Sequence, residues 1–415
     1  MMFFITTIFW IAHLAMLLAV ASYSKNKEFD SKVIATLYIF YSICPLFPFE
    51  YYHFTYHVKY GVEATPLAMY LLTDCVFLFC FISASSTRWI ETTKLCDKFR
   101  KDSIGIRILL CFAMAAFVIH LITNSQVMLL SKAEYIASEK TPNLFFLNMP
   151  AEILLLGGLF FNPFKNKLLR MTLVLLAVFA LITMLFQGYR HLLLFSLLCW
   201  LFRSRPKRGV TIPVIVLSVI GELSNPLKYF FASLLSRGEI SYADFWNYYL
   251  GGQVQLIGIS SEQKAIFSNL IIGLDHFSIF SPLLELQNLI PFVNTIFGHS
   301  QFSSANKIGI IAGTGAGQGT AYNFVLFLFE SFFIGAIFLT ISLFIVKVFS
   351  NSPLVFLAIE LFFSIMRNTP EYWAGQLKMI AAIGVLVYLL NKASDYFAFA
   401  HSVRVESVAL LSGDD

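Results

Sequence analysis

Charged residues are scarce in this sequence. Asp, Glu, Lys and Arg make up 13% of its 415 residues, whereas they form about 25% of a typical soluble domain. This deficit excludes an ordinary soluble enzyme. The net charge of +5 indicates anchoring to anionic lipid at one membrane face and not a nucleic-acid footprint, so no nucleic-acid partner is expected.

Several motifs of catalysis are also missing. The six cysteines provide neither a disulfide framework nor a CxxC metal site. The sequence contains no HExxH zinc motif and no GxSxG serine motif. It also lacks an Asp-x-Asp pair. Nucleotide-sugar transferases commonly bind a divalent metal through such a pair. We therefore expect a reaction that uses no metal and no cofactor.

Apolar residues, in contrast, are abundant, at 58% of the chain with 45 Phe. Runs of about 20 such residues can cross a hydrocarbon core of roughly 30 Å, and they must be helical because lipid offers the backbone no hydrogen-bond partners. The predicted fold class is an all-α polytopic membrane protein with about 11 transmembrane helices. The predicted spans are residues 3–22, 33–48, 66–86, 106–123, 146–161, 170–187, 191–202, 211–222, 323–347, 353–367 and 376–391.

Lys and Arg predict which connections face the cytoplasm, because cytoplasmic loops carry an excess of both. Of the 29 Lys and Arg, 19 fall in six regions. These are residues 24–32, 86–107, 162–170 and 203–208, the connection containing Lys347, and the C-terminal tail. The N-terminus is therefore predicted outside and the C-terminus inside. No basic residue precedes the first span, so we expect it to be a retained anchor and not a cleaved signal.

The predicted topology divides the chain into four parts: helices 1–8 in residues 1–222, one large outer loop between spans 8 and 9 in residues 223–322, helices 9–11 in residues 323–391, and a cytoplasmic tail in residues 392–415. Within the loop, residues 227–237 have the apolar spacing of an interfacial amphipathic helix. Residues 265–297 are apolar but interrupted by charge and proline, which indicates a re-entrant pair or a lid. An additional pair of spans there is the alternative.

The stretch LITMLFQGYRHLLLFSLLCWLF, residues 181–202, has polar residues between two apolar runs. Both flanking connections are predicted cytoplasmic, so the chain must turn at QGYRH on the outer face. Gly188 permits a tight turn, and Tyr189 suits the headgroup level. Arg190 and His191 then lie at the outer end of a helix hairpin. Either they extend to the interface to be solvated, or they bind an anion.

Other cationic residues are predicted on the same face. Arg367 lies at the outer end of the tenth span, and Arg237 and His276 fall in the large loop. A planar guanidinium makes paired, charge-assisted hydrogen bonds to phosphate oxygens, so this group is suited to a diphosphate. Carboxylates inside spans are either functional or hydrogen-bonded to neighbouring helices; they are Asp74, Glu152, Glu330 and Glu360.

Three features together resemble a known family. They are the hairpin ending in GYR, the single large outer loop late in the chain, and the glycine-rich segment GTGAGQGTAYNFVLFLFE that leads into the next span. Over most of its length the chain is similar to the Wzy-type polymerases of O-antigen and related polysaccharides. The related O-antigen ligases share this layout.

The resemblance implies a glycosyltransferase that moves a glycan from undecaprenyl diphosphate to another lipid-linked repeat unit at the periplasmic face. It implies that Arg190, with Arg237 and Arg367, binds the diphosphate, and that Tyr189 and Tyr322 contribute to substrate binding. The acceptor hydroxyl must lose a proton. His191 or His276 is the candidate base, with Asp275 as the alternative.

The location that the resemblance implies is the bacterial inner membrane, with a periplasmic N-terminus and a cytoplasmic C-terminus. The implied partners are the undecaprenyl-diphosphate-linked oligosaccharide, membrane lipids, and a chain-length regulator and a flippase of the same pathway.

Three alternatives to a polymerase remain. The first is an O-antigen ligase. The second is a lipid-linked oligosaccharide flippase or other transporter, which should carry internal repeats and charge at mid-membrane depth; no such repeat is found in the sequence. The third is a membrane scaffold, which leaves the outer Arg and His residues unexplained.

Overall fold

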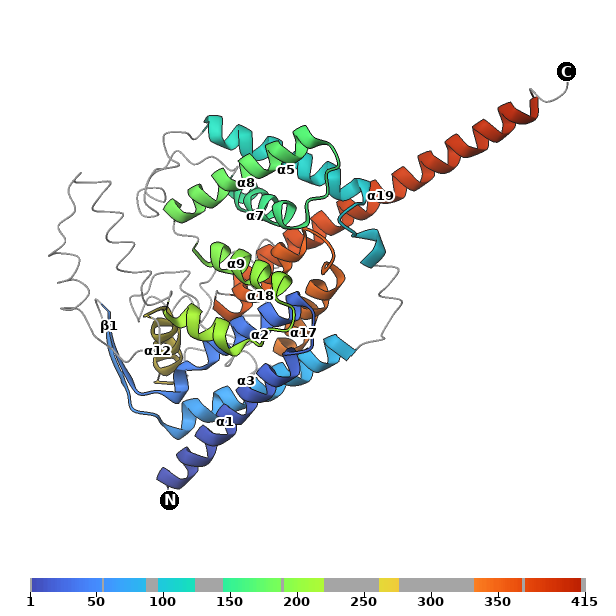
Figure 1. The fold of residues 1–415 in the computed structure, drawn as a ribbon. Coiled ribbons are helices and arrows are strands. Elements are labelled where there is room, and N and C mark those ends of the chain that lie inside the picture. Colours follow the sequence, from blue (N-terminus) through green and yellow to red (C-terminus); the bar gives the residue numbers. More distant parts are fainter. Residues whose placement is uncertain are drawn as a thin grey trace, which may run out of the picture. The chain divides into compact units, whose positions relative to one another are not determined.

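The computed structural model describes residues 2–53, 56–86, 96–123, 145–187, 190–219, 261–275, 332–367 and 370–411. Most of this part is helical (Figure 1), as predicted. Five helices are long and apolar enough to cross a membrane, within Met2–Ser24, Ala64–Ala84, Ile104–Thr123, Lys167–Met184 and Gly375–Phe397. Shorter apolar helices lie in Pro150–Phe161, Leu194–Ser204, Phe338–Val348 and Val355–Met366. The count of eleven spans stays a prediction.

The chain forms two compact units. The first contains α1 (Met2–Ser24), α2 (Phe29–Ser42), the short 3-10 helix η1 (Cys44–Leu46), β1 (Phe49–His53), β2 (Tyr56–Tyr60), α3 (Ala64–Ser86) and α12 (Ser261–Asp275). The second contains α5 (Ile104–Thr123), α7 (Phe145–Phe161) and α8 (Lys167–Gln187). Four helices contribute residues to both units: α9 (Arg190–Ser204), α17 (Phe332–Val348), α18 (Val355–Arg367) and α19 (Pro370–Leu411).

The helices differ in what surrounds them. Every residue of α18 from Val355 to Met366 is buried, and so is every residue of α2 from Lys32 to Ser42. In contrast, α1 and α8 expose large apolar side chains, such as Phe3 at 86% and Leu168 at 72%. Exposed apolar surface on this scale needs an apolar solvent. Helices α1 and α8 are therefore suited to face lipid, whereas α2 and α18 are surrounded by protein.

In the first unit, α1 and α3 run side by side (Figure 1) and make extensive contacts. The indole Nε1 of Trp10 donates to the carbonyl of Leu46 at 2.8 Å, which links α1 to η1. Between α2 and α3, the rings of Tyr38 and Phe77 stack with their centroids 3.6 Å apart. Aromatic packing and the hydrogen bond of Trp10 thus help to join α1, η1, α2 and α3.

The first unit also contains an antiparallel hairpin that sequence reasoning missed. Strands β1 and β2 pair from Phe49 with Tyr60 to His53 with Tyr56. Phe49, Val58 and Tyr60 are buried, whereas His57 and Lys59 are exposed. One face of the hairpin therefore packs against the protein and the other faces outward. The described part is mainly helical, and the hairpin is a small addition to it.

In the second unit, α5, α7 and α8 pack together through small residues. A Cβ atom on Gly158 would lie 3.0 Å from the side chain of Leu110 in α5 and 3.1 Å from that of Leu173 in α8. Gly157 faces the backbone carbonyl of Pro353, which follows α17. The absence of a side chain at both positions allows α7 to approach its neighbours closely.

Connections that were predicted to be cytoplasmic group together within each unit. In the first unit, the ammonium group of Lys32 donates to the backbone carbonyls of Pro206 and Arg208. In the second unit, the amide of Lys101 donates to the carbonyl of Asn351 at 3.0 Å, and the carboxamide of Asn391 donates to the carbonyl of Lys98 at 2.5 Å. Such contacts are expected if the connections of each unit that are predicted to be cytoplasmic lie on the same side of the membrane.

The last helix continues beyond its apolar part. The predicted span ends at Asn391, but α19 runs on to Leu411, so residues 392–411 of the predicted tail are helical. Lys98 of the second unit forms an ion pair with Asp395 on this extension, with Nζ and Oδ2 2.7 Å apart. The hydrogen bond and charge of Asp395 raise the pKa of Lys98.

Candidate functional site

Arg190 lies at the beginning of a helix. α8 ends at Gln187, and α9 begins at Arg190. Tyr189 lies outside the described residues, and for Arg190 and His191 the structure describes only the helical backbone. The first amide groups of a helix have no partner within it and, together with the helix dipole, favour a negative charge. Arg190 therefore lies at the end of α9 where backbone and side chain would both attract an anion.

The beginning of α9 packs against the end of α18. In the first unit, the rings of Phe195 and Phe363 have centroids 4.9 Å apart and meet edge to face. From Phe195, α9 leads back to Arg190 in little more than one turn, and from Phe363, α18 leads on to Arg367 in about one turn. Only the backbone of Arg367 belongs to the described part. Within the first unit, the two helices thus pack through Phe195 and Phe363.

Helix α12 lies within the predicted large outer loop and ends at Asp275. Its Phe267 is fully buried and contacts the rings of Phe49 and Tyr60 in the hairpin and Tyr70 in α3, with centroids 5.7, 4.8 and 5.3 Å away. The side-chain amide of Gln263 donates to the carbonyl of Phe40 near the end of α2. The hairpin and α12, both from predicted outer loops, therefore pack on the same end of the first unit.

The remaining predicted site residues are less well placed. Only the backbone of Asp275 is described. The other three, Arg237, His276 and Tyr322, lie outside the described residues. The structure therefore places the ends of three helices that carry predicted site residues, and the association of their side chains stays a prediction.

A buried polar network lies at the centre of α1 and α3. His13 of α1 and Asp74 of α3 are fully buried, and Nδ1 of the imidazole makes a close hydrogen bond to Oδ2 of the carboxyl group. The hydroxyl of Tyr38 in α2 donates to Oδ1 at 2.6 Å. On its other side, Nε2 of His13 lies 2.8 Å from the carbonyl of Ser42. The network connects three helices.

These contacts determine how many protons the network holds. A backbone carbonyl only accepts, so Nε2 of His13 must carry a hydrogen. One further proton must lie between Nδ1 and the Asp74 carboxyl group. The pair is therefore either imidazolium and carboxylate or neutral imidazole and carboxylic acid, and it has no net charge in either form. A neutral pair is the arrangement that a buried, low-dielectric site tolerates.

Two other acids in predicted spans also have hydrogen-bond donors nearby. In the second unit, the hydroxyl of Thr183 in α8 donates to Oε1 of Glu152 in α7 at 3.1 Å. In the first unit, Ser364 and Gln376 each place a donor 3.5 Å from Oε1 of Glu360. Glu330 lies outside the described residues. Glu152 therefore has a hydrogen-bond donor from a neighbouring helix, and Glu360 has one from its own helix and one from α19.

No three His, Cys, Asp or Glu side chains within the described ranges lie close enough to hold a metal ion. The prediction of a metal-independent reaction stays untested.

In the hairpin, burial raises the pKa of the Tyr60 hydroxyl well above its usual value. The Tyr60 hydroxyl therefore stays protonated and uncharged at ordinary pH, and it acts only as a hydrogen-bonding group.

Sequence reasoning identified Asp74 but missed His13 and Tyr38 as its partners. The available signal was weak. His13 is the one ionisable side chain in the apolar run of residues 3–22, and such a residue is expected to face a partner inside the bundle. Its partner is 61 residues away in the chain, so only the packing of α1 on α3 identifies it.

Comparison of the chain with models of protein families, with curated proteins and with solved structures gave no match.

Proposed function

We propose that this protein is a polysaccharide polymerase of the bacterial inner membrane. It transfers a glycan from undecaprenyl diphosphate to a hydroxyl group of another lipid-linked repeat unit on the periplasmic face. The donor is already activated by its diphosphate. The protein needs to hold two lipid-bound substrates, stabilise charge on the departing diphosphate and help remove the acceptor proton.

One observation carries this proposal: the helical backbone of α9 begins at Arg190. A guanidinium makes bidentate contacts to phosphate oxygens, and the amide groups at the start of a helix attract the same charge. Both contributions strengthen as charge develops on the leaving diphosphate, so they assist the reaction step itself.

The packing of α9 on α18 supports a second contribution. The contact of Phe195 with Phe363 agrees with the prediction that the start of α9 and the end of α18 face the same side. As the resemblance implies, Arg367 at the end of α18 and Arg237 from the large loop are further residues that bind the diphosphate. His191, His276 and Asp275 are the candidates for the base that accepts the acceptor proton.

The surface polysaccharide of a deletion strain tests the proposal. A polymerase deletion should leave lipid A core that carries a single repeat unit and no long chains. Core without any repeat, with polymer still attached to undecaprenyl diphosphate, would instead identify a ligase. An unchanged ladder would contradict both assignments.

A transporter is the second candidate, and the His13 and Asp74 pair favours it. Charge at mid-membrane depth is typical of ion-coupled transporters, and this pair lies near the middle of α1 and α3. In a flippase deletion, single lipid-linked repeat units should accumulate on the cytoplasmic face. They would be protected from a glycosidase added to intact spheroplasts, whereas the units that accumulate in a polymerase deletion would be digested.

A further inference from the structure

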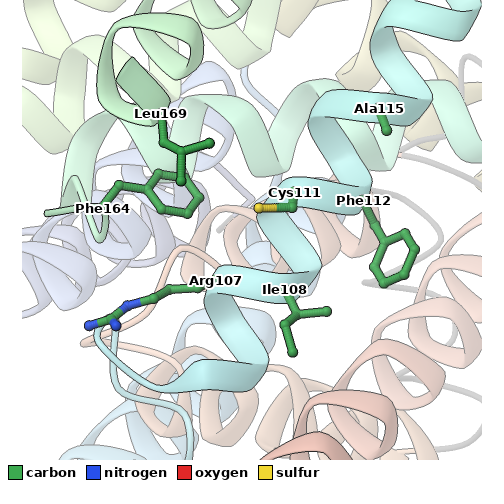
Figure 2. A pocket seen from close by; sticks show the side chains of 7 residues that line it. All are labelled: Arg107, Ile108, Cys111, Phe112, Ala115, Phe164 and Leu169. Atoms are coloured by element: carbon green, nitrogen blue, oxygen red, sulfur yellow. The ribbon is translucent and has the colours of Figure 1, made fainter. Parts of the chain in front are cut away.

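The second unit has an apolar groove whose use the proposed function does not explain. It has a volume of about 450 Å³ and is lined almost entirely by apolar atoms. Ile108, Cys111, Phe112 and Ala115 of α5 form one wall, and Phe164, which precedes α8, and Leu169 of α8 form the other (Figure 2). This volume lies in the range of ordinary small-molecule sites.

Local backbone geometry builds the second wall. α7 ends at Phe161, and the following Asn162 has a left-handed backbone with φ of 47°, a conformation that asparagine tolerates better than most residues. Its amide donates to the carbonyl of Gly158 at 2.7 Å, which closes the end of α7. The chain then turns so that Phe164 lines the groove; Figure 2 shows the sulfur of Cys111 pointing toward this ring.

One end of the groove is positively charged. Arg107 lines the groove one turn after the start of α5, and its Nε is buried without a hydrogen-bond partner within the described residues. Lys165, Lys167 and Arg170, at the connection to α8, are exposed. None of these four cations forms an ion pair with another described residue, unlike Lys98 and Arg100 on the preceding connection.

The apolar wall and the charged end lie along the membrane normal if α5 spans the membrane. From Arg107 to Ala115, α5 rises about 12 Å. The guanidinium is then at the headgroup level, and the groove extends toward the bilayer centre. Cations at the mouth of an apolar groove on the predicted cytoplasmic side match the charge and shape of a phospholipid, because basic pockets between transmembrane helices there bind anionic headgroups.

We propose that this groove binds an anionic phospholipid of the surrounding leaflet. One acyl chain lies between α5 and Phe164, and the phosphate accepts hydrogen bonds from the guanidinium of Arg107, including its buried Nε. Lys165, Lys167 and Arg170 add charge attraction at the mouth. The site is separate from Arg190, and the proposal holds whether or not the protein is a polymerase.

Photocrosslinking to the full-length protein in nanodiscs tests the proposal. Two diazirine-labelled lipids with the same acyl chains are used, one phosphatidylglycerol and one phosphatidylcholine, and mass spectrometry maps the modified peptides. Peptides covering residues 107–115 and 164–169 should be labelled more by the phosphatidylglycerol probe. Arg107→Gln should reduce this preference roughly five-fold, since one cation near a membrane surface contributes about that factor.

Two further variants make the result specific. Arg100→Gln removes the same charge from an exposed residue that pairs with Asp97 and Asp102 and does not line the groove, so the preference should persist. Ala115→Phe should fill the groove and reduce labelling by both probes. Equal labelling by the two probes in the wild type, an equal loss in the Arg107 and Arg100 variants, or crosslinking of this face to a second copy of the chain would overturn the proposal.

Discussion

His13 and Asp74 meet at the centres of two helices. His13 is the twelfth of 23 residues in α1, and Asp74 is the eleventh of 23 in α3. Their close hydrogen bond therefore lies at the depth where an isolated charge is most expensive, if both helices span the membrane. The pair is a fully buried polar contact between α1 and α3, so it fixes the register of one helix against the other.

Removing one member of this pair should destabilise the protein more than removing both. Asp74→Ala or His13→Ala leaves an unpaired buried group, at a cost of about 3–5 kcal/mol, whereas the double change to Leu replaces both with apolar volume. Thermal unfolding followed by size-exclusion chromatography of the detergent-solubilised protein measures this order. A double variant as unstable as the sum of the single variants would contradict the predicted coupling.

Gly157→Ala should lower the stability of the second unit. The added Cβ would come within 2.4 Å of the Pro353 carbonyl, so α7 or the turn at Pro353 must move, at a cost of about 1–3 kcal/mol. Gly375→Ala is the matched control because no atom of the described residues lies within 4 Å of a Cβ at that position and alanine favours helix. The same unfolding measurement should give a lower midpoint for the first variant and an unchanged or higher midpoint for the second.

The predicted topology can be tested with a reporter that is active only outside the cytoplasm. Fusions after Arg190 and within residues 240–300 should be active, and fusions after Arg100 or Lys207 should be silent, because the last two follow Lys- and Arg-rich connections. A silent fusion within residues 240–300 that is nevertheless expressed would reverse the orientation and remove Arg190 from the outer face.

Variants of Arg190 separate diphosphate binding from interfacial solvation. If Arg190 binds the diphosphate, Arg190→Ala should abolish long polymer, at a cost of roughly 2–5 kcal/mol in binding, and Arg190→Lys should restore it only in part because an ammonium lacks the bidentate fork. Ladder length on a gel, normalised to protein in the membrane, provides the measurement. A wild-type ladder from Arg190→Gln would reject the assignment and make Arg367 the next candidate.

The positions of the helices were predictable because apolar runs of sufficient length must be helical in lipid. The hairpin was not. Its residues FEYYHFTYHVKY contain neither the Asn-Gly type of turn nor a simple alternation of apolar and polar side chains. Its stability depends instead on contacts with Phe267, more than 200 residues later in the chain. Such a contact is a property of the tertiary fold and leaves no local pattern.

The candidate site was predictable to a similar degree. A single sequence identifies Arg190 as a charged residue at a helix turn, because its neighbours are apolar and its flanking connections are basic. It identifies Asp74 because a carboxylate inside an apolar run is a candidate functional residue. It cannot identify His13 and Tyr38 as partners of Asp74, since that depends on which helix faces which. The cost of an unpaired buried charge predicts that a partner exists, but packing alone selects it.

The continuity of α19 has a mechanical consequence. Its 42 residues extend about 63 Å at 1.5 Å per residue, which is about twice the thickness of the hydrocarbon core. After Gly384 the helix contains no glycine or proline. A rotation of the helix about its long axis therefore turns Leu411 by the same angle. Inserting one residue near position 400 should rotate everything beyond it by about 100°. A fluorophore fixed rigidly at that end would therefore report the rotation of α19 about its own axis, a coordinate that a label on a loop would lose.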